Sequence, residues 1–526
     1  MKYNYQQYFP YNNIRPAQDE AIQFAIDAFE KKSKRFVIIE AGTGVGKSAI
    51  GFTVARYLNR GAYFLTTQKV LQAQYMRDFG THGLESISSS TNFRCKYYKT
   101  KDCSSALREI KISKDSQFKA SCGGGCTYKL AKTKFVGAEL GTTNFPYFMA
   151  ETNYSQQLTP RGLLVIDECH NVEIQLGNFV SIEISEHFAQ TALKLKVPEL
   201  KTMHQVVTWV KKDYLPRLGN IKKHMEQKIE KFSLGSKLKE FVTISKRYEL
   251  IDKHLCKLNR FIAVFDKENW VMNTISSEQN GKKKFEFKPI DIALFSEPNL
   301  FKSGEKVLLM SATIMNKGAF CRTLGINPND VAFISIPSPF KKENRPIIYA
   351  PVAKMGLRDI ENSLPKIAEA VMAILAEHKN EKGIIHCHSY KVTNYLKENI
   401  KSKRLLTHDA SDRDRVLAKH EADPRPTVLL SPSMTEGVDL KDDASRFQII
   451  CKIPYPYLGD KLVKKRMNKW KWWYPLQTAK VVVQSVGRSI RNENDHAVTY
   501  ILDAGWQYFV DRNRKIFPKE FLECLK

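Results

Sequence analysis

The feature that most constrains this chain is a short apolar run followed directly by a glycine-rich loop. Residues 35–40 read RFVIIE, which is typical of a buried β-strand, and residues 41–48 read AGTGVGKS before a helix-like stretch that continues to residue 58. Glycines let backbone N–H groups curl around a phosphate at the N-terminus of a helix. The pattern therefore predicts a strand, a loop and a helix that bind the phosphates of a nucleotide, although Ala41 stands where the generic pattern has its first glycine.

The end of this loop carries the groups expected to touch the phosphates and the metal. Lys47 can reach the β and γ phosphates, and the Ser48 hydroxyl can bind Mg²⁺. The predicted ATP-binding and Mg²⁺-binding residues of the loop are Ala41, Gly42, Thr43, Gly44, Val45, Gly46, Lys47 and Ser48.

A pair of adjacent carboxylates follows a second buried strand. Residues 165–170 read VIDECH, so Asp167 and Glu168 come directly after an apolar strand. A nucleotide hydrolase needs one carboxylate to hold Mg²⁺ and another to orient the attacking water. We therefore expect Asp167 to be the metal partner and Glu168 to be the general base. Cys169 and His170 are neighbours in the chain and would make a poor chelate, so we do not interpret them as a metal site.

Short buried-strand patterns recur along the chain and alternate with longer helical stretches. They lie at residues 35–40, 62–65, 163–166, 307–310, 383–385, 428–430, 447–450 and 497–502. Such alternation predicts parallel α/β sheets, and the grouping of the strands on either side of about residue 330 predicts two such domains. Between residues 180 and 290, apolar residues recur at helical spacing, which predicts a helical insertion.

The composition restricts the partners and the location of the protein. The chain has 526 residues and a formal net charge of +28, from 83 Lys and Arg against 55 Asp and Glu. Such an excess favours nucleic acid as a partner, with general surface basicity as the alternative. No apolar run is long enough to cross a bilayer, and the first ten residues lack a signal-peptide core. We therefore expect no membrane insertion and no secretion, but a cytoplasmic location, or a nuclear one in a eukaryote.

Four of the ten cysteines are grouped between the loop and the carboxylate pair. They are Cys95, Cys103, Cys122 and Cys126. Four thiolates can enclose a [4Fe-4S] cluster or a tetrahedral Zn²⁺, and the spacing suits either. The surrounding residues 91–134 are rich in basic and aromatic side chains, among them Tyr97 and Tyr98. This composition suits a surface on which single-stranded nucleic acid stacks. The alternative is that the aromatic rings cover the metal site.

A series of motifs resembles, in order, the signatures of superfamily 2 helicases. The motifs are Asp167–His170 (motif II, DEAH-like with Asp-Glu-Cys-His), Ser311–Thr313 (III), Gly383–Ser389 (IV), Thr435–Asp439 (V) and Gln484–Arg491 (VI). A four-cysteine insertion before motif II and a helical insertion after it resemble the XPD/DinG branch of iron-sulfur DNA helicases. The resemblance covers nearly the whole chain and favours iron-sulfur over zinc, although the helical insertion is matched by position more than by sequence.

This resemblance implies a fold class and a set of domain boundaries. The expected class is α/β, with two RecA-like parallel-sheet motor domains, and with the iron-sulfur insertion and a helical Arch-like insertion both in the first domain. The expected boundaries are 1–90, 135–180 and 291–330 for the three parts of motor domain 1, 91–134 for the iron-sulfur insertion, 181–290 for the Arch-like insertion and 331–526 for motor domain 2.

The resemblance also implies roles for single residues. Arg488 and Arg491 are candidates for arginine fingers that reach the γ phosphate from the second domain, and Gln484 joins Lys47 and Glu168 in the catalytic set. The further expected ATP contacts are Arg15, Gln18, Gly437 and Asp439, and the expected DNA contacts are Thr67, Gln68, Gln74, Thr143 and Asn144 together with Tyr97 and Tyr98. A second aromatic cluster either stacks on bases or packs the second domain, and it consists of Trp470, Trp472 and Trp473.

Together these patterns predict a DNA helicase that depends on ATP and Mg²⁺ and unwinds duplexes in DNA repair or replication. The resemblance implies translocation on single-stranded DNA with 5′ to 3′ polarity. We expect a monomeric motor that acts on single strands and at junctions with duplex DNA, with RNA as an alternative substrate. Two other functions stay open, namely a nucleic-acid-stimulated translocase or RNA remodeller, and an ATP-gated clamp that holds single strands without unwinding.

Overall fold

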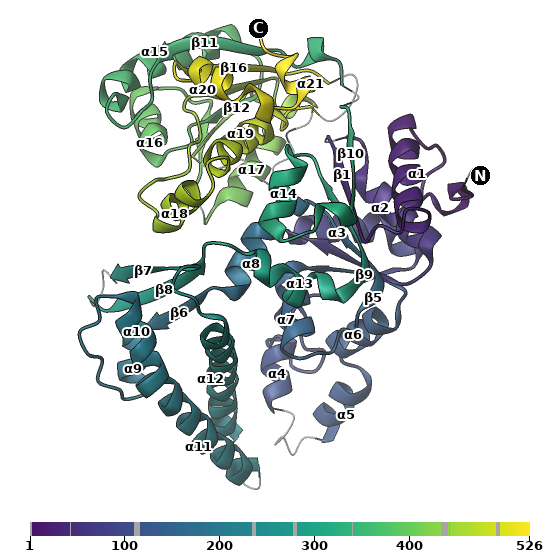
Figure 1. The fold of residues 1–526 in the computed structure, drawn as a ribbon, viewed down its shortest axis with the longest axis vertical. Helices are drawn as coiled ribbons and strands as arrows, with labels where there is room; N and C mark the ends of the chain where they lie inside the picture. Colours follow the sequence, from purple (N-terminus) through teal and green to yellow (C-terminus); the bar gives the residue numbers. More distant parts are fainter. Residues whose placement is uncertain are drawn as a thin grey trace.

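The computed structural model describes residues 3–42, 44–109, 116–233, 238–276, 281–338, 340–409, 411–432, 440, 442–490 and 495–526. These residues form two α/β lobes and an elongated arm (Figure 1). We call residues 3–180 and 291–336 lobe 1, residues 340–526 lobe 2, residues 181–290 the arm, and residues 91–134 within lobe 1 the cysteine insertion.

Lobe 1 is built on a parallel sheet of seven strands in the order β10-β1-β9-β5-β2-β4-β3. The strands are β1 (Phe36–Ala41), β2 (Ala62–Thr66), β3 (Leu84–Ser86), β4 (Leu140–Asn144), β5 (Arg161–Ile166), β9 (Gly304–Ser311) and β10 (Val331–Ile336). Alternate residues of β1 enter two different hydrophobic clusters, with Phe36 and Ile38 on one face and Val37 and Ile39 on the other. Both faces of the sheet are therefore buried under helices, as expected for parallel strands that read as continuous apolar runs.

The helices of lobe 1 connect these strands. They are α1 (Pro16–Glu30), α2 (Lys47–Leu58), α3 (Lys69–Phe79), α4 (Cys103–Glu109), α5 (Ser116–Gly124), α6 (Thr127–Gly137), α7 (Phe145–Asn153), α8 (Val172–Val180), α13 (Ala293–Asn299) and α14 (Lys317–Leu324). Cys103 lies in α4 and Cys122 in α5, whereas Cys126 directly precedes α6 and Cys95 lies before α4. The cysteine insertion is therefore a small helical unit between β3 and β4.

Lobe 2 has a parallel sheet of six strands in the order β11-β16-β15-β12-β14-β13. Its strands are β11 (Ile347–Ala353), β12 (Gly383–His386), β13 (Leu405–Thr407), β14 (Val428–Ser431), β15 (Phe447–Ile450) and β16 (Val498–Asp503). Its helices are α15 (Ile360–Glu377), α16 (Tyr390–Asn399), α17 (Arg413–Ala422), α18 (Lys461–Lys469), α19 (Trp473–Val486), α20 (Trp506–Asn513) and α21 (Lys519–Leu522).

The first sheet extends beyond the boundary that the sequence suggested. Strand β10 pairs with β1 in parallel, from Phe36 opposite Val331 to Ala41 opposite Ile336. Residues 331–336 therefore belong to the sheet of lobe 1, although the predicted boundary assigned them to the second domain. The chain crosses to lobe 2 after this edge strand.

The arm contains helices, as its periodicity predicts, and also a small sheet that the prediction lacked. Its helices are α9 (Glu186–Thr191), α10 (Met203–Trp209), α11 (Leu215–Ser233) and α12 (Leu238–Val264), and its antiparallel strands are β6 (Ile182–Ser185), β7 (Trp270–Ser276) and β8 (Lys283–Pro289). The long helices α11 and α12 pack along each other, and the sheet forms the root of the arm next to the two lobes (Figure 1). Among the described residues, no helix is both long enough and apolar enough to cross a membrane.

Candidate nucleotide site and cysteine cluster

The glycine-rich loop lies between the end of β1 and the start of α2. Gly46 immediately precedes α2 and has a φ of 87°, a left-handed conformation that favours glycine. A Cβ atom at this position would lie 2.5 Å from Gln18 Nε2 and 3.2 Å from Arg15 Nη2. Lys47 begins the helix, and its Nζ donates to the Ala41 carbonyl oxygen over 3.2 Å. The loop therefore requires glycine for conformation and for space, whereas Thr43 lies outside the described residues.

Two predicted ATP contacts at the start of α1 hold the backbone of this loop. Arg15 Nη1 donates to the Gly44 carbonyl oxygen over 2.8 Å, and Gln18 Nε2 donates to the Val45 carbonyl oxygen over 3.0 Å. The Gln18 side chain also accepts from the Arg15 backbone N–H, which caps α1. These contacts place both side chains directly against the glycine-rich loop.

The carboxylate pair follows β5, next to β9 and β2 in the sheet. The buried Asp167 accepts two hydrogen bonds, from the Tyr75 hydroxyl over 3.0 Å and from the Glu168 backbone N–H over 2.9 Å. Burial and the neighbouring negative charge of Glu168 raise the pKa of Asp167 to about 6. Burial acts in the same direction on Glu168, but the positive charge of Lys47 and the hydrogen bond with His170 outweigh it and lower the pKa of Glu168. Lys47 and both carboxylates therefore share one electrostatic site.

A chain of contacts runs from Glu168 to motif III. His170 Nδ1 lies 3.2 Å from Glu168 Oε2 and 2.7 Å from Ser311 Oγ. Ser311 Oγ in turn accepts from the Thr313 backbone N–H over 3.1 Å. The pair Glu168 and His170 is well over a hundred positions from the pair Ser311 and Thr313 in the chain. The adjacent ends of β5 and β9 bring the two pairs together.

Helix α19 of lobe 2 continues this chain of contacts across the interface between the lobes. Gln484 Nε2 donates to Thr313 Oγ1 over 3.1 Å, and Lys480 Nζ donates to the His170 carbonyl oxygen over 2.9 Å. Arg488, which follows the same helix, lies close enough to Glu168 for its charge to help lower the pKa of that carboxylate. The predicted residues of motifs II, III and VI therefore meet at one place. Gly437, Asp439 and Arg491 lie outside the described residues.

The four grouped cysteines line one small cavity in the cysteine insertion. Cys103, Cys122 and Cys126 are buried, Cys95 is half-buried, and the Sγ atoms of Cys103 and Cys126 are 3.4 Å apart. Burial, the hydrogen bond with Cys126 and the nearby thiols raise the pKa of Cys103 to about 12. Four converging thiols are the donor set that iron-sulfur clusters and structural zinc require. Within the described ranges, however, no group of three or more His, Cys, Asp or Glu side chains already has the arrangement of a metal site.

The aromatic residues of the insertion pack around this cluster. Tyr97 and Tyr98 contact each other and the buried Phe118, with ring centroids 5.0, 5.5 and 4.7 Å apart. Lys101 Nζ lies over the Tyr98 ring at 4.7 Å from its centroid. This packing favours the alternative in which the rings cover the cysteines over the one in which they form an open platform for bases.

The other predicted DNA contacts divide into exposed and buried residues. Gln74 is exposed on α3, and Thr67 and Gln68 are half-buried at the start of that helix. Asn144 caps α7 by accepting from the Tyr147 N–H over 3.1 Å. Thr143 is fully buried, and its hydroxyl donates to the Ile87 carbonyl oxygen over 2.7 Å. The prediction of a DNA contact is therefore wrong for the Thr143 side chain, because its position on β4 turns it into the lobe.

The structure also shows how the tryptophan cluster of Trp470, Trp472 and Trp473 packs. Trp473 is buried at the start of α19 and packs within the protein. Trp470 stacks against Trp472 with ring centroids 6.1 Å apart, and the guanidinium of Arg322 from α14 lies over its ring at 5.3 Å from the centroid. Of the two interpretations, packing therefore applies to Trp473, and Trp470 contributes to the contact between the lobes.

The comparison with known proteins agrees with this architecture. The family model of the type III restriction enzyme res subunit matches residues 12–197, and the model of the helicase C-terminal domain matches residues 372–523. The ATP-dependent DNA helicase YoaA of Haemophilus influenzae is 21% identical over 572 residues, which cover 90% of this chain and 88% of the relative. The ATP-dependent DNA helicase XPD of Sulfolobus acidocaldarius is 22% identical over 428 residues, which cover 76% and 74% of the two chains.

A solved structure of an XPD helicase shares the fold. Its TM-score is 0.66 at 15% sequence identity, and the match covers 96% of this chain and 99% of that one. At this level of identity the match shows a common architecture, namely two RecA-like domains with parallel sheets. The expected resemblance to ATP-dependent DNA helicases of the XPD and DinG kind is thereby confirmed.

Sequence reasoning missed three residues that stand out in this site. Tyr75 binds the carboxylate of Asp167, Lys480 contacts the backbone of motif II, and Arg466 of α18 forms an ion pair with Glu173 on α8. None of them lies in a motif, and their partners are far away in the chain, so no local pattern could have identified them.

Proposed function

We propose that this chain is an ATP-dependent DNA helicase whose two lobes close on one ATP molecule. The observation that carries the proposal is the series of contacts from Glu168 through His170, Ser311 and Thr313 to Gln484. It joins the carboxylate pair of one lobe to α19 of the other, the helix that Arg488 follows. A nucleotide bound at this place would touch both lobes at once, so its binding and hydrolysis would change how the lobes are held together.

The proposed roles follow from the chemistry of each group. The loop from Ala41 to Ser48 would cradle the phosphates, with Lys47 on the β and γ phosphates and with Ser48 and Asp167 holding Mg²⁺. Glu168, whose pKa the charge of Lys47 lowers, would orient and deprotonate the attacking water.

Lobe 2 would complete the site from the opposite side of the nucleotide. Arg488 would place its permanent positive charge on the γ phosphate, where negative charge develops during the reaction. Gln484 would keep lobe 2 aligned with lobe 1 through its hydrogen bond to Thr313. We propose corresponding roles for Arg491, Gly437 and Asp439 from their motif positions alone.

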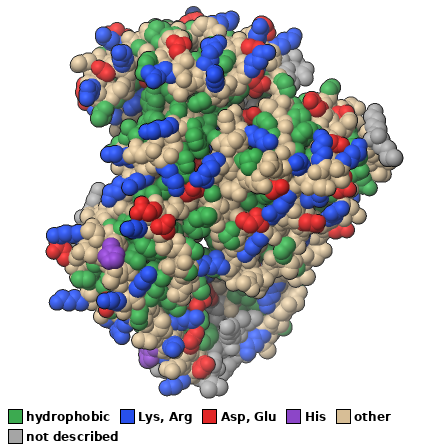
Figure 2. All heavy atoms as spheres, viewed as in Figure 1, with side chains coloured by type: hydrophobic (Ala, Val, Ile, Leu, Met, Phe, Trp, Pro, Cys, Tyr) green, Lys and Arg blue, Asp and Glu red, His purple; other side chains and the backbone are tan. Residues whose placement is uncertain are grey.

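DNA would bind across the ends of β2 and β4 in lobe 1. The exposed Gln74 and the half-buried Gln68 on or next to α3, together with Asn144 at the start of α7, offer amide groups that can contact a strand. Lys and Arg side chains are spread over both lobes and the arm on the face shown in Figure 2, which supports binding of a polyanion. The proposed substrate is single-stranded DNA and its junctions with duplex DNA, tracked in the 5′ to 3′ direction.

The cysteine insertion would hold a [4Fe-4S] cluster, with zinc as the alternative. Cys95, Cys103, Cys122 and Cys126 supply the four thiol donors, and they line one cavity. When bound, the cluster would cross-link the insertion and stabilise its fold rather than take part in redox turnover. The insertion and the arm would then correspond to the iron-sulfur and Arch-like insertions of the resemblance, between motor domains at residues 3–180 with 291–336 and at residues 340–526.

A strand-separation assay tests the proposed function. Duplexes with a 5′ or a 3′ single-stranded tail are mixed with the protein, Mg²⁺ and ATP, and separation is measured by gel or by fluorescence. We expect unwinding of the 5′-tailed duplex only, and none with the Lys47→Ala variant. ATP hydrolysis without unwinding of either substrate would indicate a translocase or RNA remodeller, and nucleotide-dependent strand binding without hydrolysis would indicate a clamp; each of these results would contradict the helicase.

A further inference from the structure

Helix α18 of lobe 2 lies against the root of the arm, which is formed by β7 and β8 (Figure 1). The helix contacts β7, and Lys461 Nζ donates to the Met272 carbonyl oxygen of that strand over 3.2 Å. Strand β8 contacts α8 of lobe 1. The root of the arm therefore lies between one helix from each lobe, although the arm is an insertion in lobe 1 by sequence.

One buried arginine makes most of the described polar contacts at this junction. Arg466 is only 8% exposed, and its Nη1 lies 2.5 Å from Glu173 Oε1 on α8. Its Nε donates to the Ile290 carbonyl oxygen over 2.8 Å, and its Nη2 lies 3.4 Å from the Pro289 carbonyl oxygen at the end of β8. The guanidinium also lies over the Trp473 ring, 5.7 Å from its centroid. The fixed fork of an arginine can serve several acceptors at once, which a lysine cannot.

The position of Glu173 connects this junction to the nucleotide site. Glu173 lies in the first turn of α8, which begins directly after motif II, and only five positions separate it from Glu168. On the side of lobe 2, α18 is followed by α19, which carries Lys480 and Gln484. Arg466 therefore belongs to the same pair of helices that contacts motifs II and III.

The arm has a second attachment, and this one involves lobe 1 alone. Arg260 of α12 donates to the Asn153 carbonyl oxygen at the end of α7, and its guanidinium lies 4.5 Å from the centroid of the Tyr154 ring. Helix α12 also contacts α4 of the cysteine insertion. If lobe 2 moves relative to lobe 1, the root of the arm is displaced while this second attachment stays in place, and the arm turns about it.

We propose that Arg466 is a positioning residue that couples the orientation of the arm to the movement of lobe 2. The proposal rests on the proposed function, because the movement in question is the closure of the lobes on ATP. Closure shifts the pair α18 and α19, Arg466 passes this shift to the end of β8, and the arm changes its angle to lobe 1. The arm is thereby driven by the nucleotide although none of its described residues lies in the nucleotide site.

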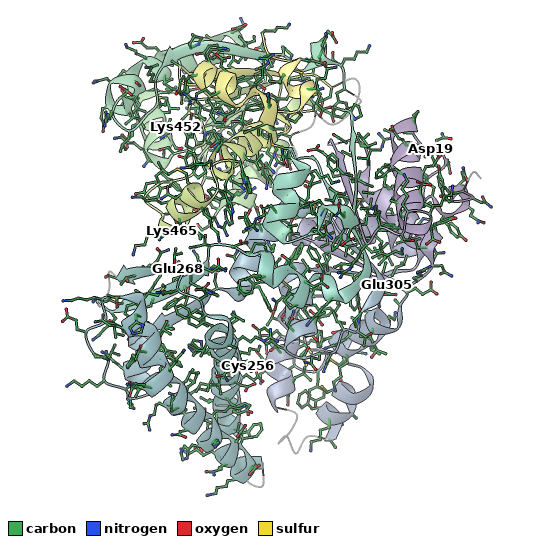
Figure 3. The ribbon with its side chains drawn as sticks, in the orientation of Figure 1. Asp19, Cys256, Glu268, Glu305, Lys452 and Lys465 are labelled. Carbon is green, nitrogen blue, oxygen red and sulfur yellow. The ribbon has the colours of Figure 1, made fainter. Side chains whose placement is uncertain are left out.

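The test measures two distances in the full-length protein by fluorescence energy transfer. The first pair of dyes is on Cys256 of α12, the exposed cysteine of the arm, and on Glu305→Cys in lobe 1 (Figure 3). The second pair is on Glu305→Cys and on Lys366→Cys, at an exposed position of α15 in lobe 2, in a Cys256→Ser background. Each pair is measured without nucleotide and with Mg²⁺ and a non-hydrolysable ATP analogue. A protein with Cys256→Ser alone reports background labelling of the other cysteines.

In the parent protein we expect the analogue to change both distances. In Arg466→Met, which keeps a long side chain against Trp473, the lobes should still approach but the arm should no longer respond. Arg466→Lys, which keeps the charge near Glu173, should restore part of the response. Lys465→Met, a change at the exposed neighbour on the same helix (Figure 3), should behave like the parent. Loss of this coupling should slow unwinding in Arg466→Met at least about fivefold relative to Lys465→Met, which is the low end of the effect that two coupled sites typically have on each other.

The outcomes separate this inference from the proposed function. If the lobes of the parent do not approach with the analogue, the proposed closure is wrong. If the lobes approach and the arm of Arg466→Met responds as in the parent, the coupling through Arg466 is wrong and the closure stands. Should Arg466→Met fail to fold, Arg466→Lys takes its place, because a lysine cannot serve Glu173 and the Ile290 and Pro289 carbonyl oxygens at once. A full arm response in that variant would also overturn the inference.

Discussion

The lobe 1 part of the candidate nucleotide site, called the cleft below, and the cysteine insertion belong to the same lobe, but different forces organise them. In the cleft, hydrogen bonds within the protein hold the glycine-rich loop and the carboxylate of Asp167, through Arg15, Gln18 and Tyr75. In the insertion, the central groups are thiols that face one another, and the pKa of Cys103 is raised because of burial and because of the neighbouring Cys126. The cleft is therefore held by hydrogen bonds within the chain, whereas the insertion gathers four thiols that a bound metal would join.

The largest expected effect removes one thiol donor. Cys122→Ser should abolish metal binding and unfold the insertion, because structural metal sites contribute on the order of 10 kcal/mol to the folding of small units. The nucleotide cleft should survive, because none of its described contacts involves residues 91–134. The expected results are loss of bound iron, from about four atoms per chain in the parent, proteolytic cleavage within the insertion, and unchanged binding of a fluorescent ATP analogue.

A matched cysteine outside the cluster provides the control. Cys256→Ser lies on the exposed face of α12, and it should leave iron content and proteolysis unchanged. Loss of nucleotide binding in Cys122→Ser would contradict the independence of the two regions. Zinc instead of iron in the parent would change the identity of the metal but leave the comparison in place.

The reverse change should impair ATP hydrolysis at the cleft and leave the cysteine insertion intact. Glu168→Gln should lower the rate of ATP hydrolysis by about 10² to 10⁴, the contribution typical of a general base. The affinity for ATP should change little, because glutamine keeps the shape of the side chain. Glu268→Gln in the arm, whose side chain is 81% exposed, serves as the control for losing one negative charge. Retained hydrolysis in Glu168→Gln would show that another group activates the water.

Two glycines with a left-handed backbone allow the cost of backbone strain to be measured separately from the cost of steric crowding. Gly46 and Gly83 have φ values of 87° and 86°, but only at Gly46 would a Cβ atom meet Gln18, whereas nothing lies within 4 Å at Gly83. Alanine should cost about 1–2 kcal/mol at each position because of the left-handed backbone. At Gly46 it should cost roughly 1 kcal/mol more, because the Gln18 side chain must leave its hydrogen bond to Val45.

Unfolding by urea measures the loss of stability in each variant, and binding of an ATP analogue measures the effect of the contact with Gln18 on the loop. Both variants should unfold at lower urea concentration than the parent, but only Gly46→Ala should also bind the analogue more weakly. Equal stability and equal affinity in the two variants would show that the contact with Gln18 does not shape the loop. In that case the conformation of the glycine-rich loop would not depend on the Gln18 side chain, and the contrast between the cleft and the insertion would be weaker.

The local patterns of the sequence identify the parts of the site that lie within a single element. The loop, the carboxylate pair and the cysteines are each defined by short-range spacing, and the structure brings their described members to common places. Pairing between distant segments is not encoded in this way. The edge position of β10 depends on its partner β1, and the arm strands were missed even though Phe285 and Phe287 alternate with polar residues in β8.

The residues found only in the structure have the same explanation. Tyr75 and Asp167 are 92 positions apart, and Arg466 and Glu173 are 293 apart. Tyr75 and Arg466 each fit an ordinary helical pattern, and only the packing of the elements reveals their contacts with Asp167 and Glu173. Thr143 shows the opposite error, because it occupies a motif position but points into the lobe.

The smallest expected effect concerns one hydroxyl that donates to the carboxylate of Asp167, the proposed Mg²⁺ ligand. Tyr75 is buried on α3 and donates to Asp167 Oδ2 over 3.0 Å. Tyr75→Phe should weaken Mg²⁺ binding roughly tenfold, at the low end of what is typical when a group that orients a metal ligand is lost. The measurements are the Mg²⁺ concentration that gives half-maximal ATP hydrolysis, and the binding of Mn²⁺ by paramagnetic resonance in the presence of a non-hydrolysable ATP analogue.

Tyr63→Phe is the matched control in the same lobe. The Tyr63 hydroxyl donates to the Thr159 carbonyl oxygen over 3.0 Å, away from the carboxylates. Both variants should lose a similar amount of stability, about 0.5–1.5 kcal/mol for one hydrogen bond, but only Tyr75→Phe should shift the Mg²⁺ dependence. An equal Mg²⁺ dependence in both would mean that the backbone alone positions Asp167. A shift confined to Tyr75→Phe, with iron content unchanged, would show that side chains of the chain set the geometry of the cleft before any ligand binds.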